Sequence, residues 1–308
     1  MSQSDPIMTL SSVSKSYGKI DALKDINFEI KAGEFVGLLG PNGAGKSTMF
    51  QIISGLFAPN EGTVTIFGRH YSDDSSAILS RLGVVFQDRS ADLDLTIKAN
   101  LAFHGRLFGL SGQRLQERIL EQTQRFDMGE MINRRVRQLS GGQQRKVEIA
   151  RALMNHPSLL IMDEATAGLD SLSRAALVQD IHNLAKVDGV SILWATHLVD
   201  EVAQADRVIL LQSGGIVADT TPEGMCAMAN TDDLTAAYAT LVKSGAPKQP
   251  QAERHWSSHS LTNHLSNSSV TGLELGERGK GQAGQTKHPY SRSKIEIWSN
   301  VCKNNPNL

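Results

Sequence analysis

One glycine-rich stretch constrains the fold of this sequence more than any other feature; it reads Gly40-Pro41-Asn42-Gly43-Ala44-Gly45-Lys46-Ser47. The stretch follows the apolar run 35–39 and precedes a segment whose apolar residues recur at helical spacing, namely Met49, Ile52, Ile53 and Leu56. A strand, a glycine loop and a helix in this order are typical of a phosphate-binding loop, in which backbone N–H groups and the helix N-terminus surround an anion. The sequence therefore predicts an α/β fold with a parallel sheet, whose ligand lies at the carboxyl ends of the strands.

The residue types at the end of this loop match the parts of a nucleoside triphosphate. Lys46 is long enough to reach the β- and γ-phosphates, and Ser47 offers Mg²⁺ a hydroxyl oxygen. Thr48, one position further, can donate to the α-phosphate. We therefore expect residues 40–48 to bind a nucleotide together with Mg²⁺.

Two carboxylates follow a second predicted strand. The apolar runs 159–162 and 191–195 are typical of short buried strands in a parallel sheet, and Asp163 and Glu164 come directly after the first of them. Because side chains alternate along a strand, the two carboxylates should point in different directions. We expect Asp163 to bind the metal and Glu164 to act as the general base toward the attacking water.

A second glycine loop, Leu139-Ser140-Gly141-Gly142-Gln143, opens another predicted helix. With the phosphate loop and the carboxylate pair in this order, the sequence resembles the ABC ATPases over about residues 7–225. The resemblance implies a P-loop NTPase (RecA-like) core with an antiparallel β subdomain and an α-helical subdomain that carries the second loop. That subdomain should cover about residues 92–155, which lack a strand pattern and place on one helix face Leu115, Ile119, Leu120 and Phe126.

The resemblance also implies how two subunits share a nucleotide. Ser140, Gly142 and Gln143 would contact the ATP that Lys46 of a second subunit holds, so that two ATP molecules lie between the subunits of a head-to-tail dimer. Tyr17 would stack on the adenine ring. The expected cofactors are therefore ATP and Mg²⁺, and the expected partner is a second ATP-binding subunit in a homodimer.

The same resemblance implies three catalytic residues, Gln87, Glu164 and His197. Gln87 would contact the metal and the attacking water and relay the state of the site to a membrane partner, and His197 would donate to the γ-phosphate. The expected metal ligands are Ser47, Gln87 and Asp163. One position departs from the family, because Ala165 stands where proline usually follows the catalytic glutamate. Alanine removes no ligand and no proton acceptor, so hydrolysis is still expected.

Charge and composition change near residue 244. Residues 1–244 carry 23 basic and 28 acidic side chains, against 8 and 4 in residues 245–308, and the whole chain has a formal net charge of -1. This balance disfavours nucleic acid as a partner. We predict an ATP-binding domain at 1–244 and a disordered tail at 245–308, in which a docking segment stays open around Trp256, Tyr290 or Trp298.

The sequence indicates where the protein works. No run approaches the roughly 18 to 20 consecutive apolar residues of a membrane-spanning helix, and the N-terminal residues lack a secretory pattern. Cys226 and Cys302 have no spacing that suggests a disulfide framework or a zinc site. We expect a peripheral protein at the cytoplasmic face of the inner membrane, bound to a separate integral membrane permease.

Two narrower resemblances concern the cargo. Residues 95–110 look like the corresponding segment of the type-2 ABC exporters, and segments 83–87, 145–151 and 193–201 resemble the ATP-binding protein found with pyrroloquinoline-quinone-dependent alcohol catabolism. Two other functions stay open: a soluble non-transport ABC ATPase acting on a macromolecular partner, and an ATP-binding subunit without turnover. A second nucleotide domain or a long insertion would favour the first, and loss of Glu164 or His197 the second. The sequence does not identify the cargo.

Overall fold

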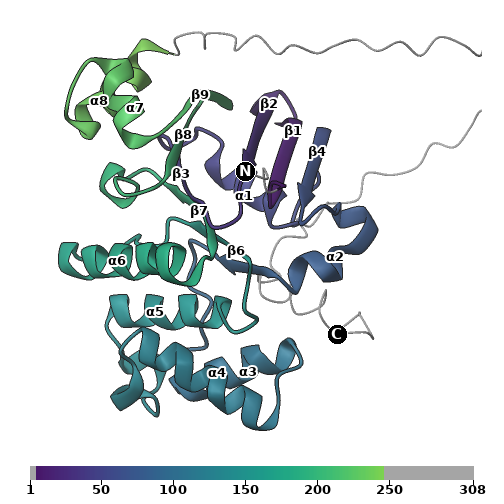
Figure 1. Cartoon of the computed structure of the whole chain (residues 1–308), viewed down its shortest axis with the longest axis vertical. Coiled ribbons are helices and arrows are strands. Elements are labelled where there is room, and N and C mark those ends of the chain that lie inside the picture. Colours follow the sequence, from purple (N-terminus) through teal and green to yellow (C-terminus); the bar gives the residue numbers. More distant parts are fainter. Residues whose placement is uncertain (1–4, 246–308) are drawn as a thin grey trace, which may run out of the picture.

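The computed structural model describes residues 5–245, in which two β-sheets and their covering helices are arranged as Figure 1 shows. Gly245 is therefore the one residue of the predicted tail within the described range. Trp256, Tyr290, Trp298 and Cys302 lie outside the described residues. Within residues 5–245, none of the helices combines the length and the apolar character needed to cross a membrane.

The larger sheet contains six strands: β3 (Phe35–Leu39), β5 (Leu82–Val85), β6 (Leu159–Asp163), β7 (Ser191–Thr196), β8 (Arg207–Gln212) and β9 (Gly215–Thr220). Their order is β5-β6-β7-β3-β8-β9. Neighbouring strands are parallel except for β8 and β9, which form an antiparallel hairpin. The carboxyl ends of β5, β6, β7 and β3 therefore lie next to one another, where a parallel sheet places its ligand.

The smaller sheet is antiparallel and has the order β2-β1-β4. Its strands are β1 (Met8–Tyr17), β2 (Ile20–Ile30) and β4 (Glu61–Ile66). Along β2, single buried residues alternate with one or two exposed residues, as expected for a sheet that packs on one face only. The mixed α/β architecture with an antiparallel subdomain confirms the predicted fold class.

Helices cover both faces of the larger sheet. Among the described residues, five α-helices lie outside the segment between β5 and β6: α1 (Lys46–Ile53), α2 (Tyr71–Leu79), α6 (Ser171–Asp188), α7 (Pro222–Ala229) and α8 (Leu234–Ser244). A 3-10 turn at Val199–Glu201 follows β7. Between β5 and β6 the chain forms α3 (Ile97–Leu107), α4 (Gly112–Arg125) and α5 (Gly141–Ala152), with two short 3-10 turns at Gly129–Met131 and Val136–Gln138. In Figure 1 these three helices lie below α6, at the opposite end of the molecule from the smaller sheet.

The larger sheet separates two apolar cores, because successive residues of a strand face opposite sides. In β6, Leu160 and Met162 pack with residues of α3 to α8, whereas Leu159 and Ile161 pack with α1 and the smaller sheet. All five residues of β6 are buried. Burial on both faces explains why this strand reads as a continuous apolar run in the sequence.

The predicted apolar face of α4 was wrong at one position. Leu115, Ile119 and Phe126 are at most 2% exposed, but Leu120 is 55% exposed. At 100° per residue, Leu120 lies about 140° around the helix from Leu115, whereas Ile119 lies about 40° away. The buried face continues instead through Gln122, which is 0% exposed.

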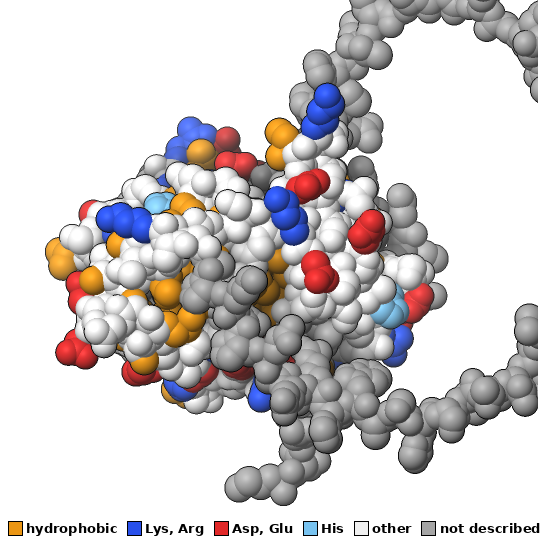
Figure 2. All heavy atoms as spheres, turned by 90° about the horizontal axis from the view of Figure 1, so that it is seen from above, with side chains coloured by type: hydrophobic (Ala, Val, Ile, Leu, Met, Phe, Trp, Pro, Cys, Tyr) orange, Lys and Arg blue, Asp and Glu red, His pale blue; other side chains and the backbone are white. Residues whose placement is uncertain are grey.

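Charged side chains of both signs are dispersed over the surface seen in Figure 2. Lysine and arginine side chains stand beside acidic ones on this face, and they do not gather into one basic area there. This dispersion fits the near balance of charges in the sequence.

Candidate functional site

The glycine loop 40–45 leaves β3 and ends at the N-terminus of α1. Two of its glycines are required by close contacts. A Cβ atom on Gly40 would lie 2.3 Å from the carbonyl oxygen of Leu211, and one on Gly45 would lie 2.5 Å from that of Ala22. Gly45 also has a φ of +110°, a backbone conformation that favours glycine. The neighbouring strands therefore hold the loop in one shape, with the first N–H groups of α1 at its end.

Lys46 lies folded over this loop. Its Nζ donates to the carbonyl oxygens of Gly40 at 2.8 Å and Pro41 at 3.2 Å, and the residue is only 5% exposed. Burial lowers the pKa of Lys46, while the nearby carboxylates of Glu164 and Asp163 act in the opposite direction. Ser47 is exposed and Thr48 is half-buried in the first turn of α1. The loop, the ammonium group and both hydroxyl groups thus lie at one end of α1.

Asp163 and Glu164 leave the sheet in different backbone conformations, whereas the sequence predicted that strand alternation would separate their side chains. Asp163 is the last residue of β6 and is 6% exposed. Glu164 lies beyond the strand in a left-handed conformation with a φ of +43°, which costs a residue other than glycine about 1–2 kcal/mol. Its N–H donates to the carbonyl oxygen of Ala195 at 2.8 Å. This backbone turn, and not strand alternation, separates the two side chains.

Side chains from the ends of three adjacent strands meet in one cluster, with Glu164 in the middle. The Nε2 of Gln87 donates to its Oε2 at 2.9 Å, and the Nδ1 of His197 lies 3.1 Å from its Oε1. Gln87 follows β5, Glu164 follows β6 and His197 follows β7, which are neighbours in the sheet. The structure therefore brings the three expected catalytic residues into one cluster, beside Asp163 and within electrostatic range of Lys46.

The second glycine loop forms the cap of α5. Ser140 Oγ accepts a hydrogen bond from the N–H of Gln143 at 3.3 Å, and Gln143 Oε1 accepts one from the N–H of Ser140 at 3.0 Å. This reciprocal arrangement is a capping box. A Cβ on Gly142 would lie 3.0 Å from Ser173, so the loop packs against the start of α6. Within the described residues, Ser140 forms its hydrogen bonds inside its own loop and helix.

Tyr17 ends β1 and has a side chain available for stacking. The residue is 44% exposed, and the Nζ of Lys15 lies 5.7 Å from the centre of its ring. An exposed aromatic ring can stack on a flat heterocycle without displacing core residues. Its position is therefore compatible with the expected contact to adenine.

Two features of the site were missed in the sequence. Glu201, 1% exposed, accepts short hydrogen bonds from Thr166 and Thr196, and burial raises its pKa. Thr196 directly precedes His197, so this carboxylate supports the segment that carries the histidine.

The buried pair Arg145 and Glu148 on α5 also had no predicted role. Charged residues spaced three apart, on a helix otherwise rich in apolar positions on that face, were the available signal for the pair.

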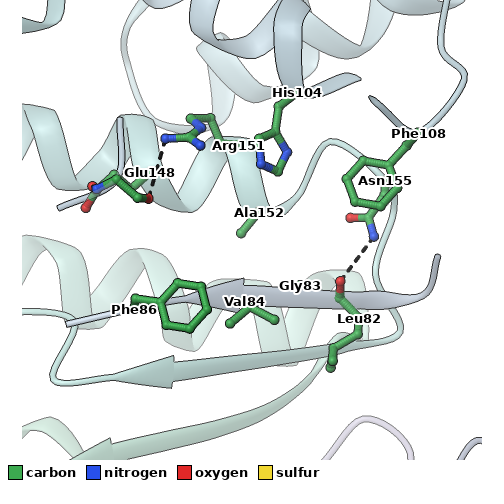
Figure 3. A pocket seen from close by; sticks show the side chains of 11 residues that line it. Leu82, Gly83, Val84, Phe86, His104, Phe108, Glu148, Arg151, Ala152 and Asn155 are labelled. Carbon is green, nitrogen blue, oxygen red and sulfur yellow. Dashed lines mark hydrogen bonds between the residues drawn. The ribbon is translucent and has the colours of Figure 1, made fainter. Parts of the chain in front are cut away.

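A pocket lies beside the segment that carries Gln87. Figure 3 shows His104, Phe108 and Arg151 facing strand β5 across it, and the pocket is also lined by Val84 and Phe86. Burial, and secondarily the charge of Arg151, lowers the pKa of His104 to about 3. The pocket therefore has an apolar wall, a neutral histidine and two opposite charges, those of Arg151 and Glu148.

The chain is similar to known proteins. A family model described as ABC transporter matches residues 23–167. The Nod factor export ATP-binding protein I of Rhizobium johnstonii is 37% identical over 217 residues, which cover 70% of this chain and 70% of that protein. Proteins named for import occur among the relatives as well.

Two solved structures are similar in fold and sequence. The dimeric post-hydrolysis structure of the ATP-binding cassette MJ0796, bound to ADP and Pi, is 34% identical with a TM-score of 0.62, and the match covers 70% of this chain and 98% of that one. The structure of cbiO1 from Clostridium perfringens, part of the ABC transporter complex cbiONQ, is 29% identical with a TM-score of 0.68 and coverages of 72% and 91%.

Proposed function

This chain belongs to the ABC transporter family as one of its ATP-hydrolysing subunits, and we propose that the cluster of Gln87, Glu164 and His197 is its hydrolytic site. The observation that carries the proposal is the position of Glu164. Its two carboxylate oxygens contact Gln87 at 2.9 Å and His197 at 3.1 Å, at the strand ends beside the glycine loop. A carboxylate oriented by two partners in this way can accept a proton from a water molecule.

We propose that ATP binds along the glycine loop. N–H groups of the glycine loop and the positive end of α1 face the phosphates, and Tyr17 stacks on the adenine. Lys46 exchanges its bonds to the carbonyl oxygens of Gly40 and Pro41 for bonds to the β- and γ-phosphates. Burial of Lys46 strengthens the interaction of its ammonium group with phosphate, because little water screens it.

We propose that residues at the start of α1 and at the ends of β5 and β6 hold Mg²⁺. Ser47, Gln87 and Asp163 supply a hydroxyl, an amide and a carboxylate oxygen, and Mg²⁺ prefers such hard ligands while keeping phosphate oxygens and water in its shell. The buried carboxylate of Asp163, 6% exposed, is the charged member of this set. When bound, the metal offsets the negative charge of the β- and γ-phosphates.

In the proposed hydrolysis step, Glu164 takes a proton from the attacking water. The water oxygen bonds to the γ-phosphorus while the bond between that phosphorus and the β–γ bridging oxygen breaks, which yields ADP and phosphate. Because the Nδ1 of His197 faces Glu164, its Nε2 is the ring nitrogen that can face the γ-phosphate. Ala165 is buried, and its carbonyl oxygen accepts a hydrogen bond from Arg145, so proline is not needed to hold this position.

We propose that a second copy of the chain completes each site. Ser140, Gly142 and Gln143 of one copy would contact the γ-phosphate held by Lys46 of the other. Two observations support this arrangement: the hydrogen bonds of Ser140 are local, and the similar cassette bound to ADP and Pi is dimeric. We further propose that residues 1–244 are the unit that carries this activity, with a helical subdomain at about 92–155.

Substitution of the proposed base tests the assignment. Glu164→Gln keeps the shape of the side chain but removes the proton acceptor, so kcat for ATP hydrolysis should fall by about 10²–10⁴-fold. ATP affinity should stay within about threefold, since binding does not need the base. The matched control is Glu117→Gln, which makes the same chemical change at an exposed position of α4. Hydrolysis by Glu164→Gln at the rate of Glu117→Gln would refute the role of Glu164.

We propose that the membrane partner is a separate permease and that it contacts the pocket of Figure 3 at the cytoplasmic face of the inner membrane. The support is that this pocket borders Phe86, next to Gln87, and that a similar protein is part of a transporter complex. Export is the proposed direction, after the Rhizobium relative. The narrower resemblance to the pyrroloquinoline-quinone-associated proteins stays a prediction.

Crosslinking tests the partner. A photo-reactive residue at Phe108, in the pocket, should capture an integral membrane protein from native membranes in an ATP-dependent manner. The same residue at Met228 of α7, which is 46% exposed, is the control and should not capture it. Capture of a soluble macromolecule from Phe108 alone would favour the alternative, a soluble non-transport ABC ATPase. Transport assays with the captured permease, in vesicles of both orientations, then decide between export and import.

A further inference from the structure

Two buried charges of α5, Arg145 and Glu148, take no direct part in the chemical step proposed above. Their side chains are 4% and 3% exposed, and they form an ion pair of 2.7 Å one helical turn apart. A buried ion pair contributes little net stability, because the desolvation of two charges offsets most of their attraction. Stability alone therefore does not account for the pair, and the other contacts of the two side chains indicate its role.

The guanidinium group of Arg145 reaches two segments that are far apart in the sequence. Its Nη1 donates to the carbonyl oxygen of Phe86 at 2.8 Å, and its Nε donates to that of Ala165 at 2.5 Å. Its Nη2 lies 3.5 Å from the carbonyl oxygen of Glu164. The carbonyl of Phe86 belongs to the peptide group that joins it to Gln87. One side chain thus holds the backbone of both Gln87 and Glu164.

Glu148 fixes the other end of the segment that carries Gln87. Its Oε2 pairs with Arg145, and its Oε1 accepts hydrogen bonds from the N–H groups of Ser90 and Ala91, the latter at 3.2 Å. Segment 86–91 is therefore bound to α5 at both ends. The same helix begins at the second glycine loop, so α5 connects that loop to segment 86–91.

The backbone at Glu164 needs such support. Its φ of +43° is unfavourable for a residue with a Cβ atom, and such conformations persist where the surroundings fix them. The carbonyl oxygen of Ala195 holds its N–H from one side, and Arg145 approaches its carbonyl oxygen from the other. The planar fork of arginine can bind several carbonyl oxygens at once, which a lysine ammonium on a flexible chain does not reproduce.

We propose that Arg145, with Glu148 as its counter-charge, is a positioning residue that sets the catalytic contact between Gln87 and Glu164 and links it to the second glycine loop through α5. The inference rests on the proposed function, because it takes Glu164 as the base. It predicts that loss of the link slows the chemical step and leaves nucleotide binding unchanged.

Steady-state kinetics of the full chain test the proposal. Arg145→Lys keeps the charge opposite Glu148 but cannot hold all the carbonyl oxygens, so kcat should fall about 10- to 100-fold, as expected for a misplaced catalytic group. The KM for ATP and the ATP dissociation constant should each change by less than about twofold. The double variant Arg145→Met with Glu148→Leu replaces the pair by apolar side chains of similar size, an exchange that often preserves stability. Its kcat should fall at least as far.

Lys146→Met is the matched control. Lys146 is the next residue of α5 and forms a 2.9 Å ion pair with Asp180 of α6, so its loss removes an ion pair of the same helix while leaving segment 86–91 in place. Its kcat should equal that of the wild type. A wild-type kcat in Arg145→Lys, or a raised KM with unchanged kcat, would overturn the proposal, and this holds even if the double variant fails to fold. If the wild-type chain and Lys146→Met do not hydrolyse ATP either, the proposed function fails instead.

Discussion

The neutral histidine of the pocket should make the free energy of unfolding depend on pH. Burial lowers the pKa of His104 to about 3, whereas a histidine in the unfolded chain titrates near 6.5. Between these two values the unfolded chain binds more protons than the folded one, so the free energy of unfolding rises with pH over this window. At pH 5 the contribution of His104 is about 1.5 pH units at 1.36 kcal/mol each, or about 2 kcal/mol of lost stability relative to pH 8.

His104→Leu should remove this loss, because leucine fills the apolar pocket and does not titrate. Urea unfolding followed by circular dichroism at pH 8 and pH 5 measures it: the wild type should lose about 2 kcal/mol more than the variant over this change, or about 4–8 °C in Tm. Phe108→Leu is the control, since it alters the ring packed 5.8 Å from His104 without removing a titrating group. Its pH dependence should match that of the wild type. An equal loss in wild type and His104→Leu would refute the burial of a neutral histidine.

Two further predictions concern the buried face of α4 and the C-terminal limit of the folded domain. Ile119→Ala should lower the free energy of unfolding by about 2–5 kcal/mol, because Ile119 is 2% exposed. Leu120→Ala should change it by less than about 0.5 kcal/mol, because Leu120 is 55% exposed. Similar urea midpoints for both variants would contradict the assigned face of α4. Removal of residues 246–308 should leave the ATPase rate within about twofold and the Tm nearly unchanged, because α8 is already packed through Ala237 and Leu241 and its cap at Gly245 is kept. A marked loss of activity or of Tm would place part of the ATP-binding domain in the removed residues.

The sequence predicted which residues gather at the strand ends, but it did not predict the residues that hold them in place. Gln87, Glu164 and His197 each follow an apolar run, and the carboxyl ends of parallel strands meet at one edge, so their convergence could be expected. The order β5-β6-β7, which makes them neighbours, depends on long-range pairing that a single sequence does not reveal. The left-handed backbone at Glu164 could not be predicted either, since its contacts with Ala195 and Arg145 join segments that are far apart in the sequence.

Helix periodicity failed where polar residues are buried. The face of α4 includes Gln122 and Thr123, 0% and 1% exposed, and a search for apolar residues alone chose Leu120 in their place. On α5, Arg145 and Glu148 read as solvent-facing charges until their mutual pairing and their backbone partners are known. Tertiary contacts decide both cases, and local spacing does not contain them.

The most direct test of the account is complementation between two inactive variants. Ser140→Arg places bulk and positive charge where the γ-phosphate of the other subunit must lie, and Lys46→Ala removes the ammonium that holds it. A mixed dimer has one site with both lesions and one site with neither, because each site takes Lys46 from one subunit and Ser140 from the other. Each variant alone should be inactive in phosphate release, and an equal mixture should recover up to about a quarter of the wild-type rate, since half of the dimers are mixed and each has one intact site. No recovery on mixing, with mixed dimers demonstrated by differential tags, or normal hydrolysis by Ser140→Arg alone, would contradict a site shared between two copies of this chain.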